Sequence, residues 1–141
     1  MKRKRILILV ILMAVVLGLV FRKQLIQTYV KVFHSSMEAY AENLLAHGST
    51  ADASYGLWDV DVYDEANMVE FRTGGFGLAP SSTYQGFYYS GDNRHQVFSA
   101  ADASIAQLEI DGDAAAWTDG TDNHGTSTRF LDRWFWYEAS F

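Results

Sequence analysis

The 141-residue sequence contains no cysteine and a single proline, Pro80. Without cysteine the chain cannot form a disulfide, and a lipid-modified cysteine after the N-terminal apolar run is excluded. A domain that lacks disulfides must be stabilised by its own hydrophobic core. The material for that core is present, because residues 55–141 include seventeen aromatic residues, each able to bury about 150–250 Å².

Lysine is absent from residues 48–141, where four arginines face fifteen acidic residues and the formal charge is −11. Residues 1–23 have the opposite character, with six basic residues and no acid. An acidic segment of this kind repels nucleic acid and anionic lipid head groups. Its composition is compatible with cations, basic peptides or neutral ligands as partners. The need for solubility alone would also account for it.

Long apolar runs are absent except for one of sixteen uncharged residues, Ile6–Phe21. As a helix this run measures about 24 Å, somewhat less than a hydrocarbon core of about 30 Å. Basic residues at both ends, in segments 1–5 and 22–23, can snorkel to make up the difference. The sequence therefore predicts a cytoplasmic stub at 1–5, a signal anchor that spans the lipid bilayer at 6–23, and a C-terminal domain outside the membrane.

A small-residue cleavage site does not follow the apolar run directly. The triplet Ala39-Tyr40-Ala41 has suitable residues, but it lies about twenty positions too late for a signal peptidase site. This favours an uncleaved anchor over the alternative of a removed signal peptide.

An apolar seam with heptad-type spacing follows the anchor, in a helical stalk predicted at 24–48. No proline or glycine interrupts residues 19–47, so the helix is expected to continue directly from the span, and Gly48 is a plausible C-cap. The seam packs either on the protein's own β domain or on a second copy, as weak self-association through residues 26–44. Its members are Ile26, Val30, Phe33, Met37, Tyr40 and Leu44.

After a short linker at 49–54, the period of the apolar residues changes from helical to two. Turn signals then recur every eight to twelve residues, which predicts an antiparallel all-β domain at 55–141, either a small sandwich or a partly open barrel. Asp111-Gly112 is a strong hairpin signal, and a final hairpin is expected around Asp132-Arg133. Expected strands lie near residues 58–62, 69–73, 84–90, 96–98, 105–110, 114–118, 126–131 and 134–141.

Glycine is concentrated in Gly74-Gly75-Phe76-Gly77, within a segment to Thr83 that we interpret as a long turn region. The spacing fits neither a dinucleotide fingerprint nor a P-loop. These glycines therefore indicate positions of positive φ or a β-bulge.

Sites for metals and catalysis are weakly indicated, and no cofactor is predicted. Asp111, Asp113, Asp119 and Asp122 are the only candidate cation ligands, and Asp-Gly pairs are equally the material of tight turns. The four histidines lack ligand spacing, and no nucleophile elbow exists. A Ser-His-Asp site could be assembled only from residues that are distant in the sequence.

Aromatic residues are densest in the run Trp134-Phe135-Trp136-Tyr137. On a strand, Trp134 and Trp136 share one face and the two alternate residues share the other, so one set belongs to the core. The second set either binds a sugar face or a peptide, or is covered by the N-terminal helix. Trp134, Trp136 and Tyr88 are the candidate ligand-binding residues.

Two segments carry a resemblance to a protein family: Gly77 to Asp92, and Thr121-Asp-Asn-His-Gly125 followed by Trp134 to Phe141. With the basic start and apolar run, the chain resembles small single-pass membrane proteins of Firmicutes-type gut bacteria. The resemblance implies a Gram-positive cell-surface location and implies no activity.

The leading hypothesis is a non-enzymatic binding or accessory protein, anchored at the cell envelope, that engages a protein or peptide partner. The alternative is a carbohydrate-binding module that uses exposed aromatic residues. A small envelope hydrolase is the third hypothesis.

Overall fold

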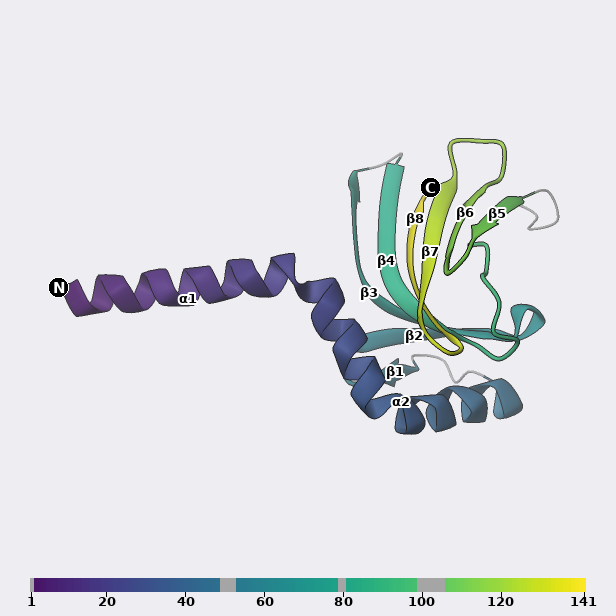
Figure 1. The fold of residues 1–141 in the computed structure, drawn as a ribbon, viewed down its shortest axis with the longest axis horizontal. Helices are drawn as coiled ribbons and strands as arrows, with labels where there is room; N and C mark the ends of the chain where they lie inside the picture. Colours follow the sequence, from purple (N-terminus) through teal and green to yellow (C-terminus); the bar gives the residue numbers. More distant parts are fainter. Residues whose placement is uncertain (1, 49–52, 79–80, 99–105) are drawn as a thin grey trace. The chain divides into compact units, whose positions relative to one another are not determined.

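The computed structural model describes residues 2–48, 53–78, 81–98 and 106–141 (Figure 1). The chain divides into two compact units, Met1–His34 and Ser35–Phe141. Helix α1 (Lys2–Val20) and the first part of helix α2 (Arg22–His47) belong to the first unit. The second unit contains the remainder of α2 and all of the β-strands.

The N-terminal helix does not continue unbroken, so the prediction of a direct continuation is wrong. Phe21 lies between the two helices and belongs to neither. Even so, its N–H donates to the carbonyl of Leu17 and its carbonyl accepts from the N–H of Leu25, both at 2.9 Å. Phe33 has non-helical φ and ψ of −106° and 15°. Neither break involves proline or glycine, and the second lies beside the boundary between the two units.

The predicted anchor requires a helix that is long and apolar enough to cross a bilayer. Among the described residues, no single helix is both long and apolar enough to cross a bilayer. The pair Ile6–Val20 and Arg22–His47 satisfies the requirement only jointly, with a sharp bend between its members. At its C-terminus α2 ends as predicted, with Gly48 at a φ of 81° in the left-handed region.

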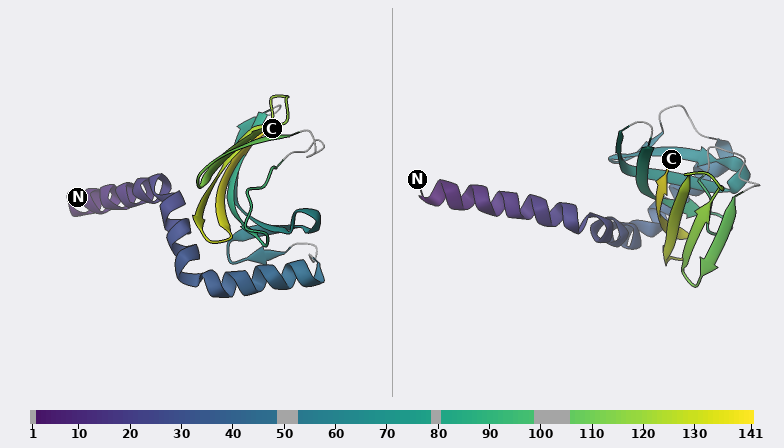
Figure 2. Two further views of the ribbon diagram at one scale, coloured as in Figure 1. Left: turned by 45° about the vertical axis from the view of Figure 1, so that its right-hand side comes forward. Right: turned by 90° about the horizontal axis from the view of Figure 1, so that it is seen from above.

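The second unit is built on one antiparallel sheet of eight strands in the order β1-β2-β3-β4-β8-β7-β6-β5. The sheet is open and strongly curved (Figures 1 and 2). An antiparallel all-β domain is therefore confirmed, as a single open sheet and not a sandwich of two. The strands are β1 (Ser54–Tyr55), β2 (Trp58–Tyr63), β3 (Met68–Leu78), β4 (Ser81–Ser90), β5 (Gln107–Asp111), β6 (Ala114–Thr118), β7 (His124–Leu131) and β8 (Trp134–Ser140), with a 3₁₀ turn at Asp64–Ala66.

Turn chemistry was predicted well at the hairpins. Gly112 has a φ of 61° between β5 and β6, and Arg133 has a φ of 63° between β7 and β8. Gly74 has a φ of 152° at a register shift between β3 and β4, which confirms the predicted bulge.

Two segments were predicted with the wrong secondary structure. The segment 74–83 is not a long turn, because β3 and β4 stay paired to Leu78 and Ser81, and residues 79–80 lie outside the described part. Residues 96–98 do not form a strand. The apolar side chain of Phe98 packs against the sheet instead, and its ring stacks on that of Tyr137 with 4.2 Å between the ring centroids.

The curved sheet buries aromatic side chains on both faces. We call the face that carries Tyr88, Phe135 and Tyr137 the inner face, where Phe98 from the β4–β5 connection packs. The opposite, outer face is covered by α2. Its buried residues are Val60, Val69, Phe71, Phe87, Tyr89, Trp134 and Trp136, with Met37, Ala41 and Leu44 from the helix.

Candidate functional site

The three aromatic residues predicted to bind a ligand all lie in the core. Trp134 and Tyr88 are fully buried and Trp136 is 3% exposed. The two tryptophans lie on the outer face beneath α2, whereas Tyr88 lies on the inner face and stacks on Phe135 at 4.9 Å. The structure therefore does not bring the three together as an exposed platform, and the carbohydrate hypothesis loses the feature on which it depended.

The four acidic residues considered for a cation lie in two separate turns, at opposite ends of β6. Asp111 and Asp113 flank the β5–β6 hairpin and are exposed. Asp119 is buried and organises the β6–β7 turn: it accepts hydrogen bonds from the backbone N–H of Thr121 (3.0 Å) and from Asn123 Nδ2 (2.9 Å). Among the described residues, no group of three or more histidine, aspartate or glutamate side chains could hold a metal ion.

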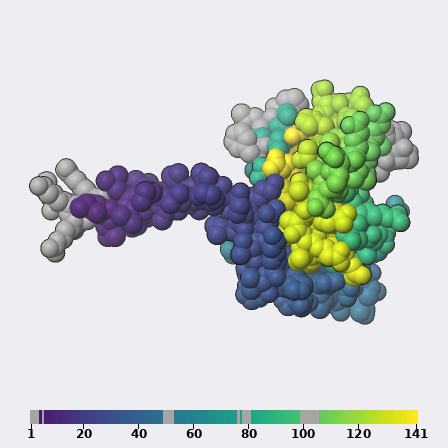
Figure 3. Space-filling model, in the orientation of Figure 1, coloured from purple at the N-terminus to yellow at the C-terminus, as the bar shows by residue number. Residues whose placement is uncertain are grey.

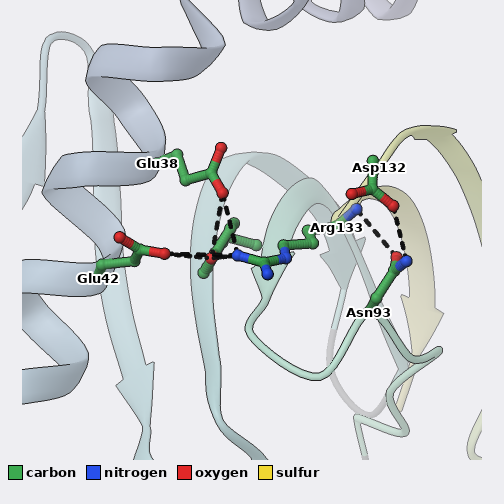
Figure 4. A network of polar contacts seen from close by, with 6 residues as sticks. Glu38, Glu42, Asn93, Asp132 and Arg133 are labelled. Atoms are coloured by element: carbon green, nitrogen blue, oxygen red, sulfur yellow. Dashed lines mark hydrogen bonds and ion pairs between the residues drawn. The ribbon is translucent and has the colours of Figure 1, made fainter.

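A polar network joins α2 to the sheet (Figure 4). The guanidinium of Arg133 donates to Glu38 (3.2 Å), to Glu42 (3.5 Å) and to the hydroxyl of Tyr89 (3.0 Å). Burial raises the pKa of Tyr89 to about 12, so its hydroxyl keeps its proton and donates to Glu42 at 3.0 Å. The left-handed backbone of Arg133 is supported by Asn93, whose side-chain oxygen accepts from its N–H at 2.9 Å. This network connects α2 to the sheet, which indicates a structural role.

The inner face carries a buried carboxylate. Glu70 is 4% exposed and accepts hydrogen bonds from the hydroxyls of Tyr63 (2.9 Å) and Tyr137. Burial raises the pKa of Glu70, and this effect exceeds the opposing effect of the two hydroxyls. The same burial raises the pKa of both tyrosines, so they act as donors at any physiological pH. Both oxygens of Glu70 are already used, which indicates a structural role.

A histidine and a serine also meet on the inner face. His95 Nδ1 lies 2.6 Å from Ser127 Oγ, and the Ser127 hydroxyl in turn hydrogen-bonds with that of Tyr88. Ser127 is 2% exposed, and none of the carboxylates described orients the ring through its second nitrogen. The pair thus lacks both the substrate access and the third member of a hydrolytic triad. Sequence reasoning missed it because the two residues are 32 positions apart and belong to no motif.

The two edges of the sheet differ. At one edge, β1 has two residues and lies under α2: the Tyr40 hydroxyl donates to the Ser54 carbonyl at 3.0 Å, and its ring contacts that of Tyr55 at 5.0 Å. At the other edge, β5 has five residues that are all exposed. Among the described residues it pairs only with β6.

The polar and the apolar side chains of β5 lie on opposite faces of the strand. Gln107, Glu109 and Asp111 lie on the outer face, whereas Leu108 and Ile110 lie on the inner face opposite Trp117 and Ala115 of β6. Ile110 is 62% exposed, and β5 and β6 form part of the molecular surface (Figure 3).

Comparison with protein-family models, with curated proteins and with solved structures finds no match to this chain.

Proposed function

We propose that the protein is a membrane-anchored binding module of the cell envelope whose partner is an extended peptide segment that adds as a strand to β5. The observation that carries this proposal is the exposed β5 edge at the end of an open sheet. An edge strand presents alternate backbone N–H and C=O groups to a partner. Each new backbone hydrogen bond contributes about 0.5–1.5 kcal/mol net.

Side chains on β5 define the chemistry of the partner. Its outer face is acidic through Glu109 and Asp111, and its inner face is apolar through Leu108 and Ile110. A segment that alternates basic and apolar residues would complement both faces. A second copy of β5 is a poor partner, because antiparallel self-pairing would bring acidic side chains close to one another.

A designed peptide tests the edge directly. A seven-residue peptide of alternating lysine and valine, added to the full chain in detergent micelles, should shift the amide resonances of β5 saturably. The same peptide methylated at alternate backbone nitrogens should bind at least tenfold more weakly, because it cannot complete the ladder.

A matched pair of variants separates the edge from general electrostatics. Glu109→Lys should abolish binding, whereas Glu65→Lys makes the same charge change at an exposed position of the 3₁₀ turn and should leave it intact. Equal losses in both variants, or binding of the methylated peptide at full strength, would show that contact with β5 is not the basis of recognition.

The anchor is the second part of the proposal. It is supported by the basic residues at both ends of the apolar segment Ile6–Phe21. A reporter enzyme fused after Phe141 should be active only on the outer side of the membrane, and the protein should keep its full length. A mature protein that begins within residues 22–42 would contradict the anchor and would support a cleaved signal peptide.

A further inference from the structure

The first turns of α2 form a short helical segment that lies between two breaks. Helix α1 ends at Val20 and α2 begins at Arg22, whereas Phe33 has non-helical φ and ψ of −106° and 15°. The axes of Ile6–Val20 and of α2 differ by 69°. Residues 22–32 therefore do not continue along the direction of the apolar run, and we call them the exit segment.

One side of the exit segment and of its two flanking residues carries exposed apolar side chains. Four of them recur every fourth residue and the fifth lies beside them, so together they form one stripe along the helix surface. Each is between 40% and 65% exposed, and the rings of Tyr29 and Phe33 lie 4.6 Å apart. A contiguous apolar surface of this kind marks a site of contact with a partner or a membrane. Its members are Phe21, Leu25, Tyr29, Val32 and Phe33.

The exit segment is also basic. Residues 22–37 contain Arg22, Lys23 and Lys31 and no acidic residue, so their formal charge is +3. The helical period places Lys23 and Lys31 on the side away from the apolar stripe. Apolar and aromatic residues on one side with basic residues on the other are typical of helices that lie in the head-group layer of anionic membranes.

The position of the exit segment in the chain favours lipid as its partner. It begins where the apolar run Ile6–Phe21 ends, and that run covers about 24 Å of a hydrocarbon core of about 30 Å. The length and hydropathy needed to cross a bilayer are reached only when α2 is counted together with Ile6–Val20. A second copy of the chain fits the stripe less well, because two exit segments in contact would bring their basic side chains together.

We propose that residues 22–33 lie in the head-group layer of the bilayer, with the apolar stripe towards the hydrocarbon and the basic side chains on anionic lipid phosphates. This inference rests on the anchor of the proposed function and adds to it a second contact with lipid. The chain then leaves the membrane surface at the break at Phe33 and not at Phe21.

Fluorescence quenching of single labels tests this placement. Because the chain has no cysteine, one introduced cysteine can be labelled selectively in the full chain, which is reconstituted in vesicles of phosphatidylglycerol and phosphatidylcholine. A nitroxide lipid should quench labels at Leu25→Cys and Val32→Cys about threefold more than a label at Gln24→Cys, which lies outside the stripe. Acrylamide, a quencher dissolved in the water, should show the reverse order.

A matched pair of charge variants tests the contact with anionic lipid. Lys31→Gln should make the Val32→Cys label about twofold more accessible to acrylamide in these vesicles, because it removes one of three positive charges. Lys4→Gln makes the same charge change beyond the other end of the apolar run and should leave the label unchanged. Equal effects of the two variants would overturn the role of the exit segment in binding anionic lipid.

A label at Leu12→Cys, within the apolar run, separates this inference from the anchor itself. If the nitroxide lipid quenches that label while the Leu25→Cys and Val32→Cys labels behave like Gln24→Cys, the inference is wrong and the anchor stands. A Leu12→Cys label that acrylamide quenches freely would overturn both. Self-quenching of Val32→Cys labels that is relieved by dilution with unlabelled protein would assign the stripe to a second copy and also overturn the inference.

Discussion

Replacement of Phe135 by alanine should strongly destabilise the β domain. The Phe135 side chain is fully buried, stacks on Tyr88 at 4.9 Å and contacts the rings of His95 and the guanidinium of Arg129. Truncation of a buried phenylalanine costs about 3–5 kcal/mol. A domain has only about 5–15 kcal/mol of stability in total, so the loss is a large fraction of it.

The expected change in melting temperature follows from the size of the unit Ser35–Phe141. For a domain of about 100 residues, 1 kcal/mol corresponds to roughly 4 °C, so Phe135→Ala should lower the melting temperature by about 12–20 °C. Near-ultraviolet circular dichroism of the full chain in micelles follows the loss of aromatic packing. Trp136→Ala should cause a comparable fall, because Trp136 is 3% exposed on the opposite face.

Tyr84→Ala is the matched control, since it removes a ring from the neighbouring strand β4 where 40% of the residue is exposed. It should lower the melting temperature by only a few degrees. If Phe135→Ala melts within a few degrees of the parent, or no lower than Tyr84→Ala, the inner-face cluster does not stabilise the sheet as argued.

Two further predictions concern polar groups. Because the folded pKa of Glu70 is raised, the parent should lose stability as pH rises from the usual glutamate range through that raised value. Denaturant titrations should show a flatter profile over this window for Glu70→Gln, whereas Glu109→Gln at the exposed edge should keep the parental profile. Arg133→Ala should expose α2 to proteolysis, because it removes the donor shared by Glu38, Glu42 and Tyr89, and Arg94→Ala should leave cleavage unchanged.

The sequence was informative where local chemistry decides structure. The Asp111-Gly112 hairpin was predicted because its turn requires left-handed backbone, which glycine adopts readily, and the Asp132-Arg133 turn was predicted from the expected strands on either side of it. Alternation in β8 correctly separated Trp134 and Trp136 from Phe135. It could not show that both sets are buried, because that depends on the packing of Met37, Ala41 and Leu44 from the helix.

Other features depend on contacts between distant residues. Phe76 and its flanking glycines look like a turn in isolation, yet pairing with Thr83 and its neighbours extends β3 through them. Phe98 has the pattern of a strand residue, but it contributes a ring to the inner-face cluster without backbone pairing. The approach of His95 to Ser127 arises only when residues 95–98 lie along the inner face.

The β5 edge is a place where the described part of the second unit departs from what stability alone favours. Stability favours a covered edge, as at β1, where the Tyr40 hydroxyl donates to the Ser54 carbonyl at 3.0 Å. All five residues of β5 are exposed instead, so we expect the edge to serve a partner and not the stability of the sheet. Glu109→Lys should therefore abolish binding of the lysine–valine peptide while it leaves the melting temperature close to that of the parent.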